Sequence, residues 1–533
     1  MKNTVFSECV VSHDLDFKLD IRGGKIYTYL LFVVLMCMLL NTSSLFASTY
    51  IDSNDEIYYD LSRLEAEGML PTGLLSTKPV SRKDAMRLLH ESESRSEGSS
   101  TFIKELIRSL RDLLRPTESS GSDARPIDTL YAKYVYTDSG VHTLTYAKAR
   151  ENEQAFNYNN NGDLYKKGSN FRMGFTSRIE DLGPFSFYMN PEFRNPNSPD
   201  SGNDLSLLKA YGVLSLPNVD IEIGKDAQWW GPGYHGSLLL SNNAVPLTII
   251  KFTNPVPFEL PWILKSFGPF KFVFFVSKLE KARRVAEPYM WGLRFDFKPH
   301  ANLEIGLERT ALLGGHGRPS DLGIWYSSLY GANNADNCWN NCYREPGDQR
   351  AGLDIKYTLP SQTQPVQIYL EADGEDEFNN LPNLWAFVSG VYLPRVLSVE
   401  RIDLRMEYAI TRGRSHTPYT WYTHSIFDSY TYHGMIMGHH IGTDSDDLFI
   451  ETSYLVPESS ARWYVNYDRE QHNLYVNASH EITHEISLGL RTYIAKNFAI
   501  SAAYGHGWLR NIGNVYQKTV NADSFSGQLN YTY

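Results

Sequence analysis

Three features are scarce in this sequence: long apolar runs, cysteines and an excess of positive charge. After residue 40, no apolar run reaches the roughly 20 residues that a membrane-spanning helix needs. Lys and Arg number 50 against 61 Asp and Glu, a net charge of −11. That charge argues against nucleic acid as a partner, because phosphate binding needs a basic surface. We also find no nucleophile elbow, phosphate-binding loop or recognisable carboxylate pair, so we expect neither an enzyme nor a cofactor.

One apolar segment does occur near the start, IYTYLLFVVLMCMLL at residues 26–40. Arg22 and Lys25 precede it, and the small-residue stretch NTSSLFAS follows it. A basic start, a short apolar centre and a small-residue exit are typical of a secretory signal peptide. A membrane anchor is the alternative, but the run is shorter than a spanning helix requires. We predict a cleaved signal peptide over residues 1–47 and export of the rest of the chain.

Residues 48–126 carry helical patterning that ends in a linker. Apolar residues recur on one face of DEIYYDLSRLEAEGML and again along TFIKELIRSLRDLLRP. Ser81, with Asp84 three residues later, is an acidic variant of the capping box that begins a helix. Pro116 stops the last stripe, and Gly and Ser residues follow it. The pattern predicts a small bundle of three amphipathic helices.

From Ile127 to the C-terminus the hydrophobic period changes to two. In FRMGFTSRIE, Phe171 and Met173 lie on one face, whereas Arg172 and Arg178 lie on the other. The same alternation recurs in many later segments, including IDLRMEYAIT and EISLGLR. Alternation alone fits both a soluble β-sandwich and a membrane barrel.

Three features favour the membrane barrel. The polar faces carry charges of both signs, and the strands are joined alternately by short turns and by long polar loops. The chain also ends in FSGQLNYTY, which alternates and finishes on an aromatic, as outer-membrane barrels do. We predict an all-β transmembrane barrel of about 18 antiparallel strands over residues 127–533, with one doubtful strand at residues 136–142. A barrel of this size either conducts or needs a plug.

Three stretches resemble the Wzi family of capsule-assembly outer-membrane proteins: WWGPGYHGSLLLSNNAVP, GGHGRPSDLGIWYSSLYG and MIMGHHIGTDSDDL. The resemblance covers nearly all of the predicted mature chain. The polar start before the signal segment and the motif NCWNNC depart from the family pattern.

This resemblance implies an outer-membrane barrel of eighteen strands with a periplasmic helical bundle. It implies a lectin that holds capsular or a related extracellular polysaccharide at the cell surface. Its other expected partners are outer-membrane lipid, lipopolysaccharide and the barrel-assembly machinery, and the chain is expected to be a monomer. The alternative is an outer-membrane channel that conducts saccharides. The two functions differ in whether the lumen is open.

One candidate polysaccharide site is the stretch KDAQWWGPGYHGSLLLSNN. Aromatic faces stack on sugar rings while amides bind hydroxyl groups, and a rigid turn holds both ready. The candidates are Trp229, Trp230, Tyr234, Gln228, Asn242 and Asn243. The alternative is that the two tryptophans pack a loop in the barrel mouth or join an interfacial girdle. For this pair the packing role is the narrowly favoured alternative.

A second candidate is the loop SHTPYTWYTHSIFDSYTYHG, which we expect to be the more exposed of the two. Its candidate residues are Tyr419, Trp421, Tyr422, Tyr430 and Tyr432. Histidines also gather there and just beyond, at His416, His424, His433, His439 and His440. They show no spacing typical of zinc ligands, so we expect them to form hydrogen bonds and predict no metal site. The nearby acidic stretch TDSDDL could bind calcium, but it lacks the glycine and the distal glutamate of an EF-hand loop. We therefore predict no calcium site there.

The cysteines generate the first prediction. Cys9 and Cys37 would leave with the signal peptide, and Cys338 and Cys342 remain. In an exported protein such a pair predicts a local disulfide at an exposed loop tip. Its loss should destabilise the protein by about 2 kcal/mol or less, because the closed ring is small. Thiol labelling of native cells should find both cysteines oxidised; two free thiols would rule the disulfide out.

Overall fold

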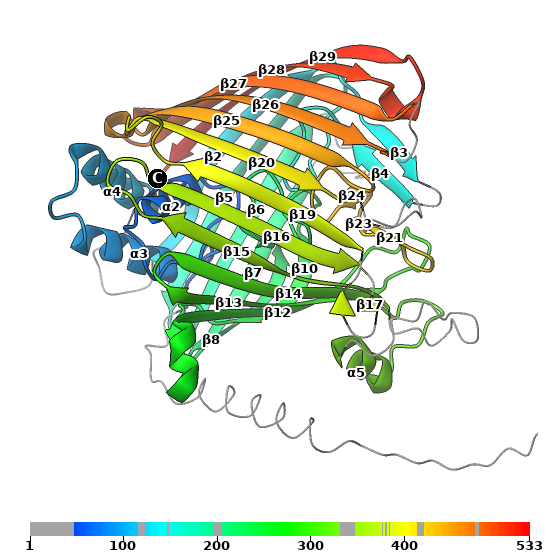
Figure 1. Cartoon of the computed structure of the whole chain (residues 1–533), viewed down its shortest axis with the longest axis horizontal. Helices are drawn as coiled ribbons and strands as arrows, with labels where there is room; N and C mark the ends of the chain where they lie inside the picture. Colours follow the sequence, from blue (N-terminus) through cyan, green and yellow to red (C-terminus); the bar gives the residue numbers. More distant parts are fainter. Residues whose placement is uncertain are drawn as a thin grey trace, which may run out of the picture.

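The computed structural model describes residues 47–115, 123–146, 149–195, 205–330, 347–375, 377–378, 381–382, 384–412, 421–474 and 479–533. Within these ranges an antiparallel sheet closes on itself into a barrel of eighteen strand positions (Figure 1). The strands are β2 (Asp123–Thr137), β5 (Gly168–Leu182), β6 (Phe185–Asn195), β7 (Leu205–Leu216), β8 (Val219–Asp226), β10 (Leu247–Thr253) with β11 (Phe258–Glu259), β12 (Pro269–Lys278), β13 (Tyr289–His300), β14 (Leu303–Leu313), β15 (Asp348–Leu359), β16 (Val366–Glu375), β19 (Trp385–Leu393), β20 (Ile402–Ile410), β25 (Asp446–Val456), β26 (Ala461–His472), β27 (Glu481–Ala495), β28 (Phe498–Arg510) and β29 (Thr519–Thr532). The predicted fold class is confirmed.

Each barrel strand pairs with its neighbours in chain order, and β29 pairs with β2 to close the ring. β10 and β11 both pair with β12, so together they count as one of the eighteen strand positions. The doubtful segment at residues 136–142 adds no barrel strand in the described chain. β2 ends at Thr137, and His142 begins β3 (His142–Tyr146), which pairs with β4 (Ala149–Glu153) in a separate hairpin.

The two ends of the barrel differ in how the strands are joined. At one end the turns are short, for example at residues 183–184, 301–302 and 496–497. At the other end lie long connections, including residues 227–246 between β8 and β10. In outer-membrane barrels the short turns face the periplasm and the long loops face the exterior. The three helices of residues 57–114 and the C-terminus lie at the short-turn end (Figure 1).

The wall alternates as the sequence predicts. On β25, Leu448, Ile450 and Tyr454 point outward, and Tyr454 is 46% exposed. Asp447 and Glu451 on the same strand point inward and are buried. A closed ring satisfies the backbone hydrogen bonds, so the strands need no uniformly apolar run to cross a membrane. No helix of the described chain is long and apolar enough to do so.

Charges inside the wall are paired across neighbouring strands. The Arg294 guanidinium lies 2.8 Å from Asp296, 2.7 Å from Glu308 and 2.7 Å from Asp354, and all four side chains are fully buried. This arrangement spans β13, β14 and β15. It confirms that the polar faces of the strands line the lumen.

Three helices form where the patterning predicts them: α2 (Ile57–Ala66), α3 (Arg82–Ser94) and α4 (Thr101–Leu114). The Ser81 hydroxyl caps α3 by accepting a hydrogen bond from the Asp84 backbone N–H at 3.0 Å. The helices share a core that contains Leu61, Leu88 and Leu110. The next strand, β2, begins at Asp123, before the expected domain boundary at residue 127.

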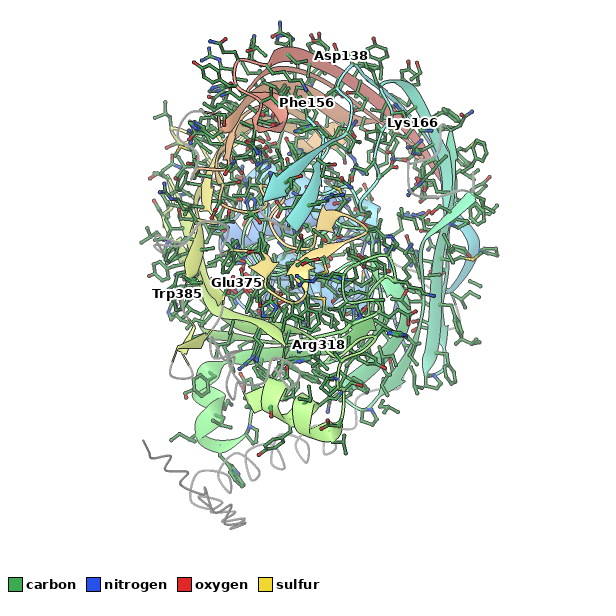
Figure 2. All side chains as sticks on the ribbon, turned by 90° about the vertical axis from the view of Figure 1, so that its right-hand side faces the viewer. Asp138, Phe156, Lys166, Arg318, Glu375 and Trp385 are labelled. Atoms are coloured by element: carbon green, nitrogen blue, oxygen red, sulfur yellow. The ribbon has the colours of Figure 1, made fainter. Side chains whose placement is uncertain are left out.

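Shorter elements complete the described chain. They are β1 (Thr77–Lys78), β9 (Trp229–Trp230), β17 (Glu377–Phe378), β18 (Leu381–Pro382), β21 (Thr423–His424), β22 (Asp428–Ser429), β23 (Thr431–Tyr432), β24 (Met435–Ile436), α5 (Leu322–Tyr330) and the 3₁₀ turns η1 (Trp262–Phe267), η3 (Pro457–Ser459) and η4 (Ile512–Asn514). Seen from the loop end, the β3–β4 hairpin and the strands of β21–β24 lie inside the ring of barrel strands (Figure 2).

Closure of the ring gives the second prediction. Removing residues 530–533 would delete the register pairs Asn530–Tyr131, Tyr531–Leu130 and Thr532–Thr129 between β29 and β2. It would also remove the hydrogen bond from the Tyr533 N–H to the Asp128 carbonyl. We expect the truncated chain to stay in the periplasm without forming a heat-modifiable barrel, because an unpaired edge cannot be tolerated in lipid. The full-length Tyr531→Phe variant is the control and should assemble; normal assembly of the truncation would contradict the prediction.

Candidate functional site

The loop at residues 227–246 folds into the lumen rather than away from the barrel. Its β9 segment pairs with β1 of the N-terminal region, Trp230 opposite Thr77 and Trp229 opposite Lys78. Thr77 in turn donates a hydrogen bond to Asp296 on the wall at 2.6 Å. The N-terminal segment, the loop and the barrel wall therefore meet at one place.

Both tryptophans of this loop are packing residues in the structure. Trp230 is fully buried, and its ring meets the edge of Phe275 at a centroid distance of 5.5 Å. Trp229 is 3% exposed and lies under the Lys78 ammonium at 4.9 Å. Burial lowers the pKa of Lys78 to about 7, because the cation loses its hydration there. A sugar contact for Trp229 or Trp230 stays a prediction.

The amides of this loop also hold the fold together. Gln228 donates to the carbonyl of Ala227 at 2.9 Å. Asn242 donates to the carbonyl of Asn159 at 3.0 Å, and Asn243 donates to that of Ile436 at 3.1 Å. All three amide side chains are buried.

The expectation that the second loop is the more exposed one is wrong for its described part, residues 421–445. Trp421, Tyr422 and Tyr430 are fully buried, and Tyr432 is 9% exposed. Tyr419 lies outside the described residues, as do Cys338 and Cys342. The physical reason is the width of the lumen: an eighteen-strand ring leaves space that its own side chains cannot fill. Aromatic side chains that fold inward lose contact with water and occupy it.

The two loops pack on each other inside the barrel. Tyr422 donates to the Leu238 carbonyl at 2.5 Å, and Tyr430 donates to the Leu239 carbonyl at 3.0 Å. The two tyrosine rings stack at 5.7 Å with an interplanar angle of 3°. Burial raises the pKa of the Tyr422 phenol well above its usual range, so the hydroxyl keeps the proton that it donates.

Tyr234 differs from the other candidates because it lines a cavity. This loop-side cavity has a volume of about 360 Å³ and lies beside β2 and the strands from β25 to β29. The Tyr234 hydroxyl donates to Glu451 at 2.9 Å, and Arg405 lies over its ring at 4.2 Å. The side chains that suit a sugar in this lining are tyrosines and amides: Tyr158, Tyr165, Tyr234, Tyr464, Asn157, Asn159, Asn160 and Asn466.

Sequence reasoning missed most of this lining. Tyr158, Asn157, Asn159 and Asn160 come from FNYNNNGD, at residues 156–163, between β4 and β5. An aromatic residue beside several amides is the same signal that marked the loop 227–246, so the stretch could have been found. Tyr464 and Asn466 point inward from β26 and look in the sequence like any other wall residues.

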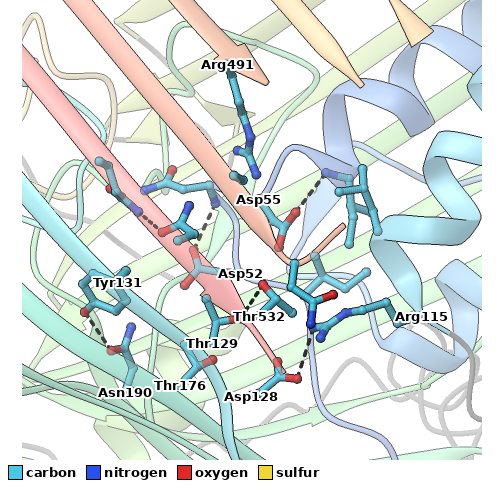
Figure 3. Close-up of a pocket in the computed structure, with 18 of the residues that line it drawn as sticks. Asp52, Asp55, Arg115, Asp128, Thr129, Tyr131, Thr176, Asn190, Arg491 and Thr532 are labelled. Carbon is cyan, nitrogen blue, oxygen red and sulfur yellow. Dashed lines mark hydrogen bonds and ion pairs between the residues drawn. The ribbon is translucent and has the colours of Figure 1, made fainter. Parts of the chain in front are cut away.

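A larger cavity of about 1070 Å³ lies between the helical bundle and the wall. Its lining includes ion pairs and hydrogen bonds, such as Arg115 with Asp128 at 3.1 Å and Tyr131 with Asn190 at 2.9 Å (Figure 3). Lys133 and Asn160 line both cavities, so the two spaces follow one another along the same side of the lumen. Both linings contain tyrosines and amides, but many more of the residues around the larger cavity are charged, whereas the loop-side cavity has Lys133, Glu451 and Arg462. The loop-side cavity therefore suits an uncharged sugar better.

The closed ring, the inward loops and the bundle at the short-turn end define a plugged outer-membrane β-barrel. Residues 143–522 match the family described as capsule assembly protein Wzi, and the chain belongs to that family. A curated relative, a 55.8 kDa protein of the cps region of Klebsiella pneumoniae, is 26% identical over 353 residues. That alignment covers 65% of this chain and 62% of the relative, so the chain matches less than two thirds of the relative's length.

A solved structure has the same fold. It is that of Wzi from Escherichia coli, an outer-membrane protein involved in group 1 capsule assembly and a carbohydrate-binding β-barrel. The match covers 91% of this chain and 100% of that one, with a TM-score of 0.70 and 20% identity. At this identity the likeness establishes the fold alone.

The third prediction concerns the buried aromatic residues. The double variant Trp421→Ala, Tyr422→Ala should loosen the plug, because each large-to-small change in a packed core costs about 3–5 kcal/mol. Limited proteolysis of the purified barrel should then cut the loop 421–445 faster than in the unmodified protein. Tyr422→Phe, which removes only the bonds of the hydroxyl to Leu238 and His439, should show a smaller effect.

The opposite outcome would separate packing from binding. If the double variant kept full protease resistance but lost polysaccharide retention per folded barrel, the two rings would contact the glycan directly.

Proposed function

We propose that this protein holds capsular or a related extracellular polysaccharide at the outer face of the outer membrane, as a lectin and not as an enzyme. The observation that carries the proposal is a lumen filled by its own loops that keeps one cavity lined with tyrosines and amides. Membership of the capsule assembly family supports it. We further propose that the chain is a monomer, exported with a cleaved signal peptide and inserted by the barrel-assembly machinery among lipid and lipopolysaccharide.

The loop-side cavity suits a segment of a sugar chain. Ligand pockets are typically about 300–1,000 Å³, and this one falls within that range. The ring faces of Tyr158, Tyr234 and Tyr464 offer stacking surfaces, while Asn159 and Asn466 offer amide hydrogen bonds to hydroxyl groups. A single stacking contact adds about 0.5–1.5 kcal/mol beyond the area that it buries. One site is therefore weak, but many barrels on one cell bind a single polymer together.

The packed loops argue against a wide saccharide channel. The core between the two inward loops includes Trp230, Leu238 and Trp421 as well as wall residues such as Phe275 and Val388. It packs the loops against the wall from β10 to β20 through buried side chains. We therefore expect the plug to remain in place during function.

The fourth prediction tests the cavity. Tyr464→Ala removes an inward ring from β26 and should lower polysaccharide retention several-fold per folded barrel, as loss of one stacking contact implies. The control is Tyr454→Ala on the adjacent strand β25, whose side chain points outward, and it should retain polysaccharide normally. Both are measured as cell-associated against shed polysaccharide, normalised to heat-modifiable barrel in the membrane. Tyr464→Phe should restore most of the retention.

Two results would contradict the proposal. Unchanged retention in Tyr464→Ala and in the triple variant with Tyr158→Ala and Tyr234→Ala would remove the loop-side cavity as the sugar site. A large, steady single-channel conductance of the unmodified protein in planar bilayers would favour the saccharide channel instead.

A further inference from the structure

Two histidines of the inward loops lie next to two carboxylates of the wall strand β26. His235 comes from the loop 227–246 and His440 from the loop 421–445, whereas Asp468 and Glu470 point inward from β26. The His235 Nε2 lies 2.9 Å from Asp468 Oδ2, and the His440 Nε2 lies 2.9 Å from Glu470 Oε1. One ligand atom from each residue can be chosen so that all four lie within 4.8 Å of one another.

We propose that His235, His440, Asp468 and Glu470 bind one divalent transition-metal ion, with Zn²⁺ as the best fit. Two imidazoles and two carboxylates are a ligand set that Zn²⁺ accepts in tetrahedral geometry. Metal–ligand bonds of about 2.0–2.2 Å separate neighbouring ligand atoms by roughly 3.3–3.6 Å. The two histidine–carboxylate pairs are slightly closer than this, and the other pairs of ligand atoms lie within 4.8 Å.

Several buried atoms at this place have no hydrogen-bond partner among the described residues. His440 Nδ1 is in this group, and the residue is only 7% exposed. The other ring nitrogen, Nε2, forms the ion pair with Glu470. One oxygen each of Asp468 and Asp447 is also without a partner. Asp447 Oδ2 lies 3.7 Å from the His235 Nε2 and 3.9 Å from the His440 Nε2. Buried polar atoms are normally paired, and a cation would supply the missing interaction to the nitrogen and carboxylates together.

Aromatic rings enclose the two histidines. Tyr158 stacks on His440 at 4.8 Å, and Phe449 stacks on His235 at 3.9 Å. Such a shell fixes the rings and limits access of water to the ligands. Tyr158, His235 and Phe449 also line the loop-side cavity, which gives an ion a route to the cluster.

The consequence is a bridge between three separate segments of the chain. An ion held here would fasten both inward loops to the wall strand β26 and so hold the plug closed. The sequence predicted no metal site because the histidines of the cluster are far from the other ligands in the chain. The shortest step from a histidine to the next ligand, from His440 to Asp468, is 28 residues.

The experiment uses the full chain, purified in detergent without a polyhistidine tag and stripped with a chelator. We expect it to bind one Zn²⁺ per chain by equilibrium dialysis, and Co²⁺ to give the visible absorption of a four-coordinate ion. His235→Gln with His440→Gln should lower the affinity at least tenfold. The matched control, His424→Gln with His433→Gln, alters two other histidines of the second loop and should bind as the unmodified protein does.

A second pair of variants keeps the proposal testable if the first does not fold. Asp468→Asn with Glu470→Gln preserves the shape of both side chains and should also lose binding. Zn²⁺ should slow proteolysis of both inward loops in the unmodified protein and not in either double variant. The proposal is overturned if the unmodified chain binds no ion, or if folded variants bind it with unchanged affinity.

Discussion

The lumen of an eighteen-strand ring has to be filled, and the rest of the structure depends on how this is done. Side chains on the wall reach only part of the way across so wide a barrel. The chain supplies the remainder with two inward loops, with the β3–β4 hairpin and with a strand from its N-terminal segment. The N-terminal strand and one of the loops meet where β1 pairs with β9, and there Thr77 links the helical bundle, the loop tryptophans and Asp296 of the wall.

Contacts with buried charged residues determine where the inward loops lie. Inside the barrel a cation is costly unless a carboxylate or an aromatic ring is next to it. Arg350 illustrates this: it pairs with Asp348 at 3.1 Å and Glu375 at 2.5 Å, and it lies 4.1 Å over the ring of Tyr430. The wall charges are thus partners for the loop as well as for each other. A loop displaced by one or two residues would take the Tyr430 ring away from Arg350, so this contact favours the observed position of the plug.

The wall could be predicted from the sequence because its pattern is local. Alternating side chains on Phe171 to Arg178, short turns and the aromatic C-terminus each act over a few residues, and each agrees with the structure. The direction of the loops could not be predicted in the same way. Trp421 and Tyr422 have a composition that fits an exposed sugar site as well as a packed core. Which one applies depends on Leu238, almost two hundred residues away, and on the diameter of the closed ring.

The inward direction of the loops also decides which aromatic side chains can still contact a ligand. An aromatic ring binds a sugar only if one of its faces remains free, and the rings that close the lumen have no free face. Tyr158, Tyr234 and Tyr464 instead line the loop-side cavity, which the plug leaves beside β2 and the strands from β25 to β29. A rigid plug makes such a cavity useful, since rings already held in place lose little conformational entropy when a sugar chain arrives. The packing that closes the barrel to transport is therefore also what prepares its remaining cavity for binding.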